Sequence, residues 1–124
     1  MGKEKINYGK LVRDKIPKRI EESGGSCEVS QLSDDEFRKE LVKKVGEEAS
    51  GVTQARGKKE LISEIGDLLD VVDQIVRVFE ISSQQIERSR KKEFKRKGGF
   101  DKKLFLVWAE DTGYKSNEKK GEGE

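Results

Sequence analysis

Residues 58–80 constrain the fold of this chain most, because their apolar side chains recur with the period of an α-helix. One row of apolar residues stands at positions 61, 65, 68, 72, 75 and 79, and a second row stands at 62, 69 and 76. Spacings of three and four residues place each row on one face of a helix. The two rows are wide enough to bury most of the helix surface, so we predict that 58–80 is the central helix of the fold.

Acidic residues follow a separate row on the same helix. Glu64, Asp67 and Asp70 are spaced by three residues, which places them along nearly one face. Neighbouring carboxylates repel one another, and a divalent cation such as Mg²⁺, which prefers oxygen ligands, would relieve that repulsion. Glu47 and Glu48 on the preceding helix would join the row if the two helices run antiparallel across the short basic turn between them. The alternative is a solvated acidic face, which is common on amphipathic helices.

The preceding helix has a clear start signal. Ser33 is followed three residues later by Glu36, which is the spacing of a capping box, and apolar residues keep one stripe to about Ala55. Gly46 and Gly51 each weaken this helix by roughly 1 kcal/mol relative to alanine. Close packing is the simplest reason for two glycines there.

Two further helices are predicted from residues that typically start or stop a helix. Pro17 is tolerated in the first turn of a short helix that reaches about Ser23 and stops at a glycine pair. Ser82 with Gln85 repeats the capping box and opens a helix to about Lys97.

Two short runs are strand candidates. Residues 27–32 alternate weakly between polar and apolar, and residues 104–108 are continuously apolar, so the two would pair as a short β-ribbon; a strap across the helices is the alternative for 104–108. Residues 111–124 have almost nothing to bury and are predicted to be a disordered tail. The expected fold is therefore one all-α, antiparallel helical bundle over residues 1–110.

The composition excludes several kinds of site. The 124 residues are 42% charged and 31% hydrophobic, with a formal net charge of +2. The absence of histidine and the single cysteine, Cys27, exclude histidine-based zinc sites, histidine-activated nucleophiles and an internal disulfide. Any catalysis therefore depends on carboxylates, lysines, arginines or a metal. No apolar run is long enough to span a membrane and no apolar signal region is present, so we expect a cytoplasmic protein without a membrane partner.

Basic residues are candidates for binding phosphate. Arg13 and Lys15 precede the first predicted helix, and both residue types commonly contact phosphate groups. The alternative for Arg13 is a salt bridge with Asp14 or with a helix carboxylate, which would fix the N-terminal segment.

A second basic region lies near the C-terminus. Residues 87–103 contain nine basic and three acidic residues, a net charge of +6. We interpret this region as a solvated helix that draws anionic ligands toward the acidic site. We do not expect nucleic acid as the main partner, because no motif that recognises nucleic acid is present.

Five short motifs follow one another along the chain. They are YGKLVRDKIP at 8–17, DEF at 35–37, EE at 47–48, EIGD at 64–67 and KGGF at 97–100. From about Asn7 to Trp108 the chain thereby resembles the phosphoribosyl-ATP pyrophosphohydrolase-like branch of the MazG-type all-α nucleotide pyrophosphohydrolases. LVRDKIP and GGF are specific to that branch, whereas E-x-x-D alone is not.

The resemblance implies an enzyme of the house-cleaning kind. Such an enzyme hydrolyses a nucleoside triphosphate, or a phosphoribosyl-ATP-like nucleotide, to the monophosphate and pyrophosphate. The resemblance also implies Mg²⁺ as cofactor, with Mn²⁺ as a substitute, and a homodimer or higher homo-oligomer.

The resemblance further implies a set of site residues. In the family, E-E-x-x-E and E-x-x-D motifs on two helices supply the metal ligands, and four positions match: Glu47, Glu48, Glu64 and Asp67. Gly51 stands in place of the third glutamate, so Asp70 or a water would replace that ligand. We assign Glu48, Glu64, Asp67 and Asp70 to the metal and Glu47 to orienting or deprotonating the attacking water. The alternative function is a non-catalytic nucleotide-binding or nucleic-acid-associated helical module.

Overall fold

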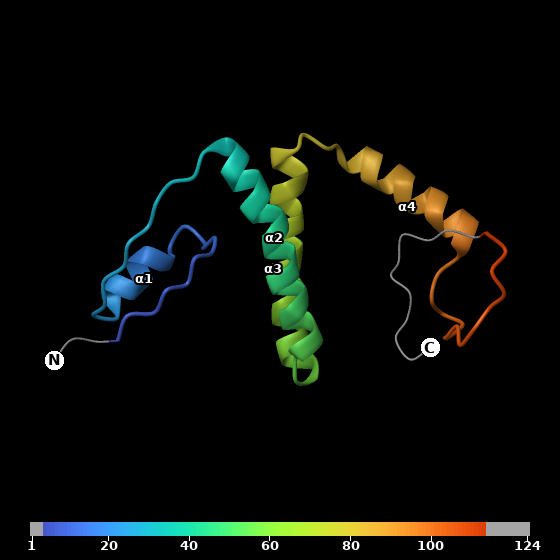
Figure 1. The fold of residues 1–124 in the computed structure, drawn as a ribbon, viewed down its shortest axis with the longest axis horizontal. Helices are drawn as coiled ribbons and strands as arrows, with labels where there is room; N and C mark the ends of the chain where they lie inside the picture. Colours follow the sequence, from blue (N-terminus) through green and yellow to red (C-terminus); the bar gives the residue numbers. More distant parts are fainter. Residues whose placement is uncertain (1–3, 114–124) are drawn as a thin grey trace. The chain divides into compact units, whose positions relative to one another are not determined.

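The computed structural model describes residues 4–113. Within them the regular secondary structure consists of α-helices alone, which confirms the predicted all-α class. The four helices of this part are α1 (Ile16–Glu22), α2 (Asp34–Gln54), α3 (Gly57–Val78) and α4 (Ser83–Lys97) (Figure 1). The chain divides into two compact units, one ending at Glu87 and one beginning at Arg88. None of the helices described is long and apolar enough to span a membrane. Most of the predicted tail, residues 114–124, lies outside the described residues.

The predicted β-ribbon is wrong. Neither 27–32 nor 104–108 forms a strand within the described part of the chain. The side chains of 104–108 are 66–88% exposed, so this run is not buried as a strap either. A strand of this length is stable only when a partner pairs its backbone and covers one face, and these runs have neither.

The helix boundaries follow the predicted signals closely. Ser33 Oγ accepts a hydrogen bond from the Glu36 amide at 3.2 Å, and the Ser33 amide donates to Glu36 Oε1 at 3.2 Å, which completes the first capping box. This hydrogen bonding lowers the pKa of Glu36. Ser82 and Gln85 form the same reciprocal pair at the start of α4, at 3.1 and 2.8 Å. In both capping boxes the side chains satisfy amides of the first helical turn. The predicted starts of α2 and α4 are therefore confirmed.

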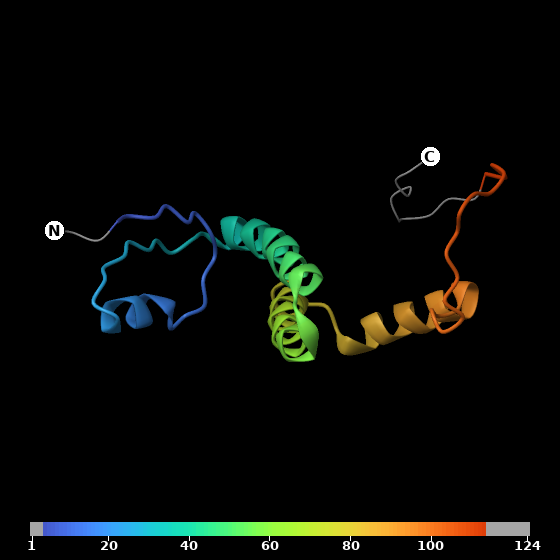
Figure 2. The same cartoon turned by 90° about the horizontal axis from the view of Figure 1, so that it is seen from below.

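Helices α2 and α3 lie side by side and make the main tertiary contact of the first unit (Figures 1 and 2). Leu41 of α2, 3% exposed, is the one buried apolar residue in the described part of the chain. No residue of α3 is buried. In its second apolar row Ile62 is 63% and Leu69 55% exposed, whereas Val76 is half-buried, and four residues of the first row are 37–43% exposed. The expectation that α3 buries most of its surface is therefore not met, because one neighbouring helix covers only one of its faces.

Candidate metal centre

A two-residue connection sets the register of the two helices that carry the acidic residues. Helix α2 ends at Gln54 and α3 begins at Gly57, which has a φ of +79°. Glycine adopts this left-handed conformation without the steric cost that a Cβ atom would bring. The backbone amide of Arg56 donates to Glu60, which satisfies one amide at the start of α3. This tight connection places the last two turns of α2 against the first turns of α3.

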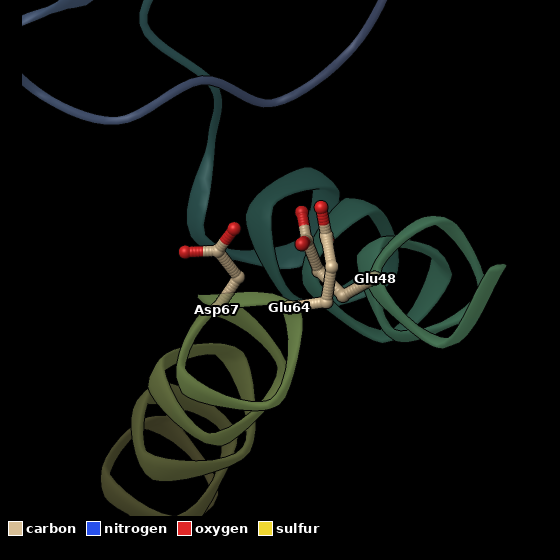
Figure 3. Close-up of side chains that lie close together, drawn as sticks. All are labelled: Glu48, Glu64 and Asp67. Atoms are coloured by element: carbon tan, nitrogen blue, oxygen red, sulfur yellow. The ribbon is translucent and has the colours of Figure 1, made fainter. Parts of the chain in front are cut away.

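Three carboxylates converge at this junction. Glu48 of α2 and Glu64 and Asp67 of α3 each offer an oxygen, and these oxygens lie within 4.8 Å of one another. Figure 3 shows the three carboxylates on the same side of the helix pair. Oxygen ligands about 2.1 Å from a Mg²⁺ ion are separated by at most about 4.2 Å, so a small inward movement of flexible side chains would let all three bind one ion. The residues present therefore fit a divalent cation.

Gly51 makes room for one of these carboxylates. A Cβ atom built on Gly51 would collide with the Glu64 carboxylate and lie 2.9 Å from Glu64 Cδ. Close packing was the predicted reason for the two glycines of α2, and it holds for Gly51 only, since a Cβ on Gly46 would meet nothing within 4 Å. Glu64 thus takes the space in which a side chain at position 51 would stand.

Arg13 crosses from the N-terminal segment to the acidic face of α3. Its Nη2 donates to Asp67 Oδ1 at 3.1 Å and to Asp70 Oδ2 at 2.8 Å. The hydrogen bond to Asp70, together with the negative charges of Asp70, Asp67 and Glu48, raises the pKa of Arg13. The Arg13 side chain is 60% exposed, and exposed ion pairs contribute only about 1 kcal/mol or less, so ligands in solution can displace it.

Lys44 lies at the other end of the acidic group. Its Nζ donates to the Leu11 carbonyl oxygen at 2.9 Å and to Glu47 at 2.8 Å, and it lies 3.9 Å from Glu48 Oε1. The hydrogen bond from Lys44 lowers the pKa of Glu47. Lys44 is only 15% exposed, so it is a fixed part of the site and ties the N-terminal segment to α2.

The structure divides the predicted site residues into three groups. Glu48, Glu64 and Asp67 come together as predicted. Glu47 and Asp70 lie outside this triad, each paired with a cation, and Arg13 makes the predicted alternative contact, a salt bridge to helix carboxylates. The Lys15 side chain forms no ion pair with the acidic residues of α2 and α3 within residues 4–113.

Lys44 is the site residue that sequence reasoning missed. A signal was present, because Lys44 precedes Glu47 and Glu48 by three and four residues, the spacings at which helical side chains meet. Five carboxylates and the two cations bonded to them make up the group, and the charges of Lys10 and Lys43 also act on Glu47, so the carboxylates outnumber these cations by one. The members of the group are Glu47, Glu48, Glu64, Asp67 and Asp70, with Arg13 and Lys44. The three converging carboxylates of the triad carry the negative charge that would attract a divalent cation.

The chain was compared with protein-family models, with curated proteins and with solved structures, and no match was found in any of the three comparisons.

Proposed function

We propose that this protein is a Mg²⁺-dependent nucleotide pyrophosphohydrolase that cleaves a nucleoside triphosphate to the monophosphate and pyrophosphate, as a MazG-type antiparallel bundle. The observation that carries the proposal is the convergence of Glu48, Glu64 and Asp67 from two helices within 4.8 Å. A polyphosphate requires compensation of its charge, and Mg²⁺ held by a few carboxylates is a common way to supply it. The motif resemblance adds the reaction type.

The roles of the residues follow from their surroundings. Glu48, Glu64 and Asp67 would hold the ion, which when bound supplies stabilisation of charge on the phosphate oxygens. Glu47 is held by Lys44 with a lowered pKa, so it stays ionised at neutral pH. An ionised carboxylate of low basicity is better suited to orienting a water by accepting its hydrogen bond than to removing its proton. Glu47 is therefore proposed to orient the attacking water.

A homodimer is part of the proposal. In the second apolar row of α3, Ile62 is 63% and Leu69 55% exposed, and covering the part of each side chain that is still exposed would contribute roughly 1–2 kcal/mol. A second copy that packs on this face would turn two helix pairs into a four-helix bundle. The site residues of each pair would remain on the opposite, acidic face.

The test is pyrophosphate release from a panel of standard and damaged triphosphates, with and without Mg²⁺ or Mn²⁺. Activity should require the cation and fall by roughly 10²-fold or more in Glu64→Gln and Asp67→Asn, because mutation of groups that only support a metal ligand already costs about 10–100-fold. Asp73→Asn is the matched control, because it removes a carboxylate from the same helix at the next spacing of three. Metal-independent activity, or equal losses in all three variants, would contradict the proposal.

A second candidate function, binding of single-stranded nucleic acid, is favoured by one observation on the unit that begins at Arg88. Phe100 is 92%, Phe105 88% and Trp108 72% exposed, and they follow the basic helix α4. Exposed aromatic rings that follow a basic helix in the sequence are elements from which a stacking surface for bases is built. Salt-sensitive RNA or DNA binding that disappears in an R88Q/K91Q/K92Q/K95Q variant would support this function. If the protein binds neither RNA nor DNA at low salt, this second function is excluded.

A further inference from the structure

Arg13 and a metal ion would compete for the same carboxylate. Asp67 is a member of the triad with Glu48 and Glu64, and its Oδ1 is also the acceptor for Arg13 Nη2 at 3.1 Å. Asp70, which receives the shorter bond of 2.8 Å from the same nitrogen, is not in the triad. The two acceptors of Arg13 therefore differ in their relation to a metal ion: the ion would be coordinated by Asp67 and not by Asp70.

We infer that Arg13 is an exchangeable counter-ion: it neutralises Asp67 in the metal-free protein, stays on Asp70 when a divalent cation binds, and then donates to the phosphate chain of the nucleotide. This inference rests on the proposed function and adds to it a positioning residue, Asp70, which holds Arg13 at the edge of the site. Asp70 is thus assigned a role other than that of a replacement metal ligand.

The chemistry of the guanidinium suits such an exchange. It carries five N–H donors in a planar fork, and only Nη2 is used by the acceptors on α3 in the described structure. The remaining donors are those with which arginine binds phosphate oxygens, often two at a time. The 60% exposure of the side chain leaves these donors accessible to a ligand.

The backbone beside Arg13 is anchored independently of this exchange. Lys44, 15% exposed, donates to the carbonyl oxygen of Leu11, two residues before Arg13. This hydrogen bond involves neither Asp67 nor Asp70, so it remains when a metal takes Asp67. The exchange therefore needs only a rotation of the Arg13 side chain and no release of the N-terminal segment.

The test measures binding of two probes to the full chain, independently of turnover. Mn²⁺ alone is followed by electron paramagnetic resonance, and inorganic triphosphate is titrated calorimetrically in the presence of saturating Mn²⁺. Arg13→Met should bind Mn²⁺ more tightly, because the competitor for Asp67 is removed, and should bind triphosphate about tenfold more weakly, because charged hydrogen bonds are lost. Arg38→Met, which removes an arginine paired with Asp35 on α2, should leave both affinities within twofold.

Asp70 variants separate positioning from ligation. Asp70→Asn should weaken triphosphate binding about as much as Arg13→Met while retaining most of the Mn²⁺ affinity, and Asp70→Glu should restore triphosphate binding. Arg13→Lys, which keeps the charge and loses the fork, should fall between wild type and Arg13→Met. Circular dichroism verifies the fold of each variant.

The outcomes distinguish two failures. If the wild-type protein binds Mn²⁺ and triphosphate, and Arg13→Met binds both as the wild type does, the exchange is overturned and the proposed function stands. If Asp70→Asn loses Mn²⁺ as Asp67→Asn does, Asp70 is a ligand and its positioning role is overturned. If the wild-type protein binds no Mn²⁺ at millimolar concentration, the proposed function fails and the exchange fails with it.

Discussion

Gly51 has a specific consequence at the scale of single residues. Its missing side chain leaves the space that the Glu64 carboxylate takes. The position of the Glu64 carboxylate of α3 therefore depends on the absence of a Cβ atom at position 51 of α2.

Gly51→Ala is expected to separate stability from metal binding. The Cβ atom would push the flexible end of Glu64 away, which weakens divalent-cation binding, whereas the helix gains about 1 kcal/mol from the substitution. Gly46→Ala is the matched control on the same helix, where a Cβ meets nothing within 4 Å, and it should gain stability without losing metal affinity. Thermal denaturation and Mn²⁺ titration measure the two effects. Equal metal affinity in both variants would contradict the role given to Gly51.

The Lys44–Glu47 pair predicts a pH effect. Lys44 lowers the pKa of Glu47 in the folded protein, so the pair contributes stability that is present above the unfolded pKa of a glutamate, about 4.3, and is lost as the pH falls through the lower folded value. In Lys44→Met the pKa of Glu47 should rise. Carboxyl-detected NMR titration of both proteins checks this, and an unchanged Glu47 titration would show that Lys44 does not hold the carboxylate in solution.

The sequence predicted that Glu48, Glu64 and Asp67 come together, because carboxylate positions on two neighbouring helices are visible in the motifs. It also placed Asp70 in this group, whereas Asp70 lies outside the triad and pairs with Arg13. For Arg13 the sequence left two alternatives, phosphate binding and a salt bridge to a carboxylate. Choosing between them requires the path of residues 4–15, which the sequence does not give. The approach of Glu64 to Gly51 was not predictable, because it depends on the separation and rotation of two helices.

At the scale of elements, the helix ends depend on a few side chains. Ser33 accepts from and donates to Glu36, and this pair fixes where α2 begins. Ser33→Ala should destabilise the unit ending at Glu87 by about 1 kcal/mol, the usual cost of losing an N-cap. Ser33→Asp, which keeps an acceptor, should restore the loss. Urea denaturation measures both, and an unchanged midpoint in Ser33→Ala would show that the cap contributes nothing.

Local signals predicted the helices well, because capping residues, Pro17 and apolar periodicity act within a few residues. The strand prediction for 27–32 and 104–108 was wrong, because a strand needs a pairing partner that local sequence signals do not specify. Local signals also overestimated the burial of α3, since periodicity indicates which faces are apolar but not whether another element covers them.

At the scale of the whole molecule, the uncovered row of α3 predicts self-association. Ile62→Glu or Leu69→Glu places a charge on the proposed dimer face and should convert a dimer to a monomer in sedimentation equilibrium, because burying an unpaired carboxylate is costly. Ser63→Glu, on the same helix beside Ile62, is the charge-matched control and should remain dimeric. A monomeric wild-type protein would contradict the dimer.

The central claim is that one divalent cation is shared by two helices. Mn²⁺ titration followed by electron paramagnetic resonance tests it most directly, on the wild-type protein, on Glu48→Gln from α2 and on Asp67→Asn from α3. The account predicts one site per chain in the wild type and a loss of at least about tenfold in affinity in each variant. Wild-type affinity in either variant, with the fold retained, would contradict it.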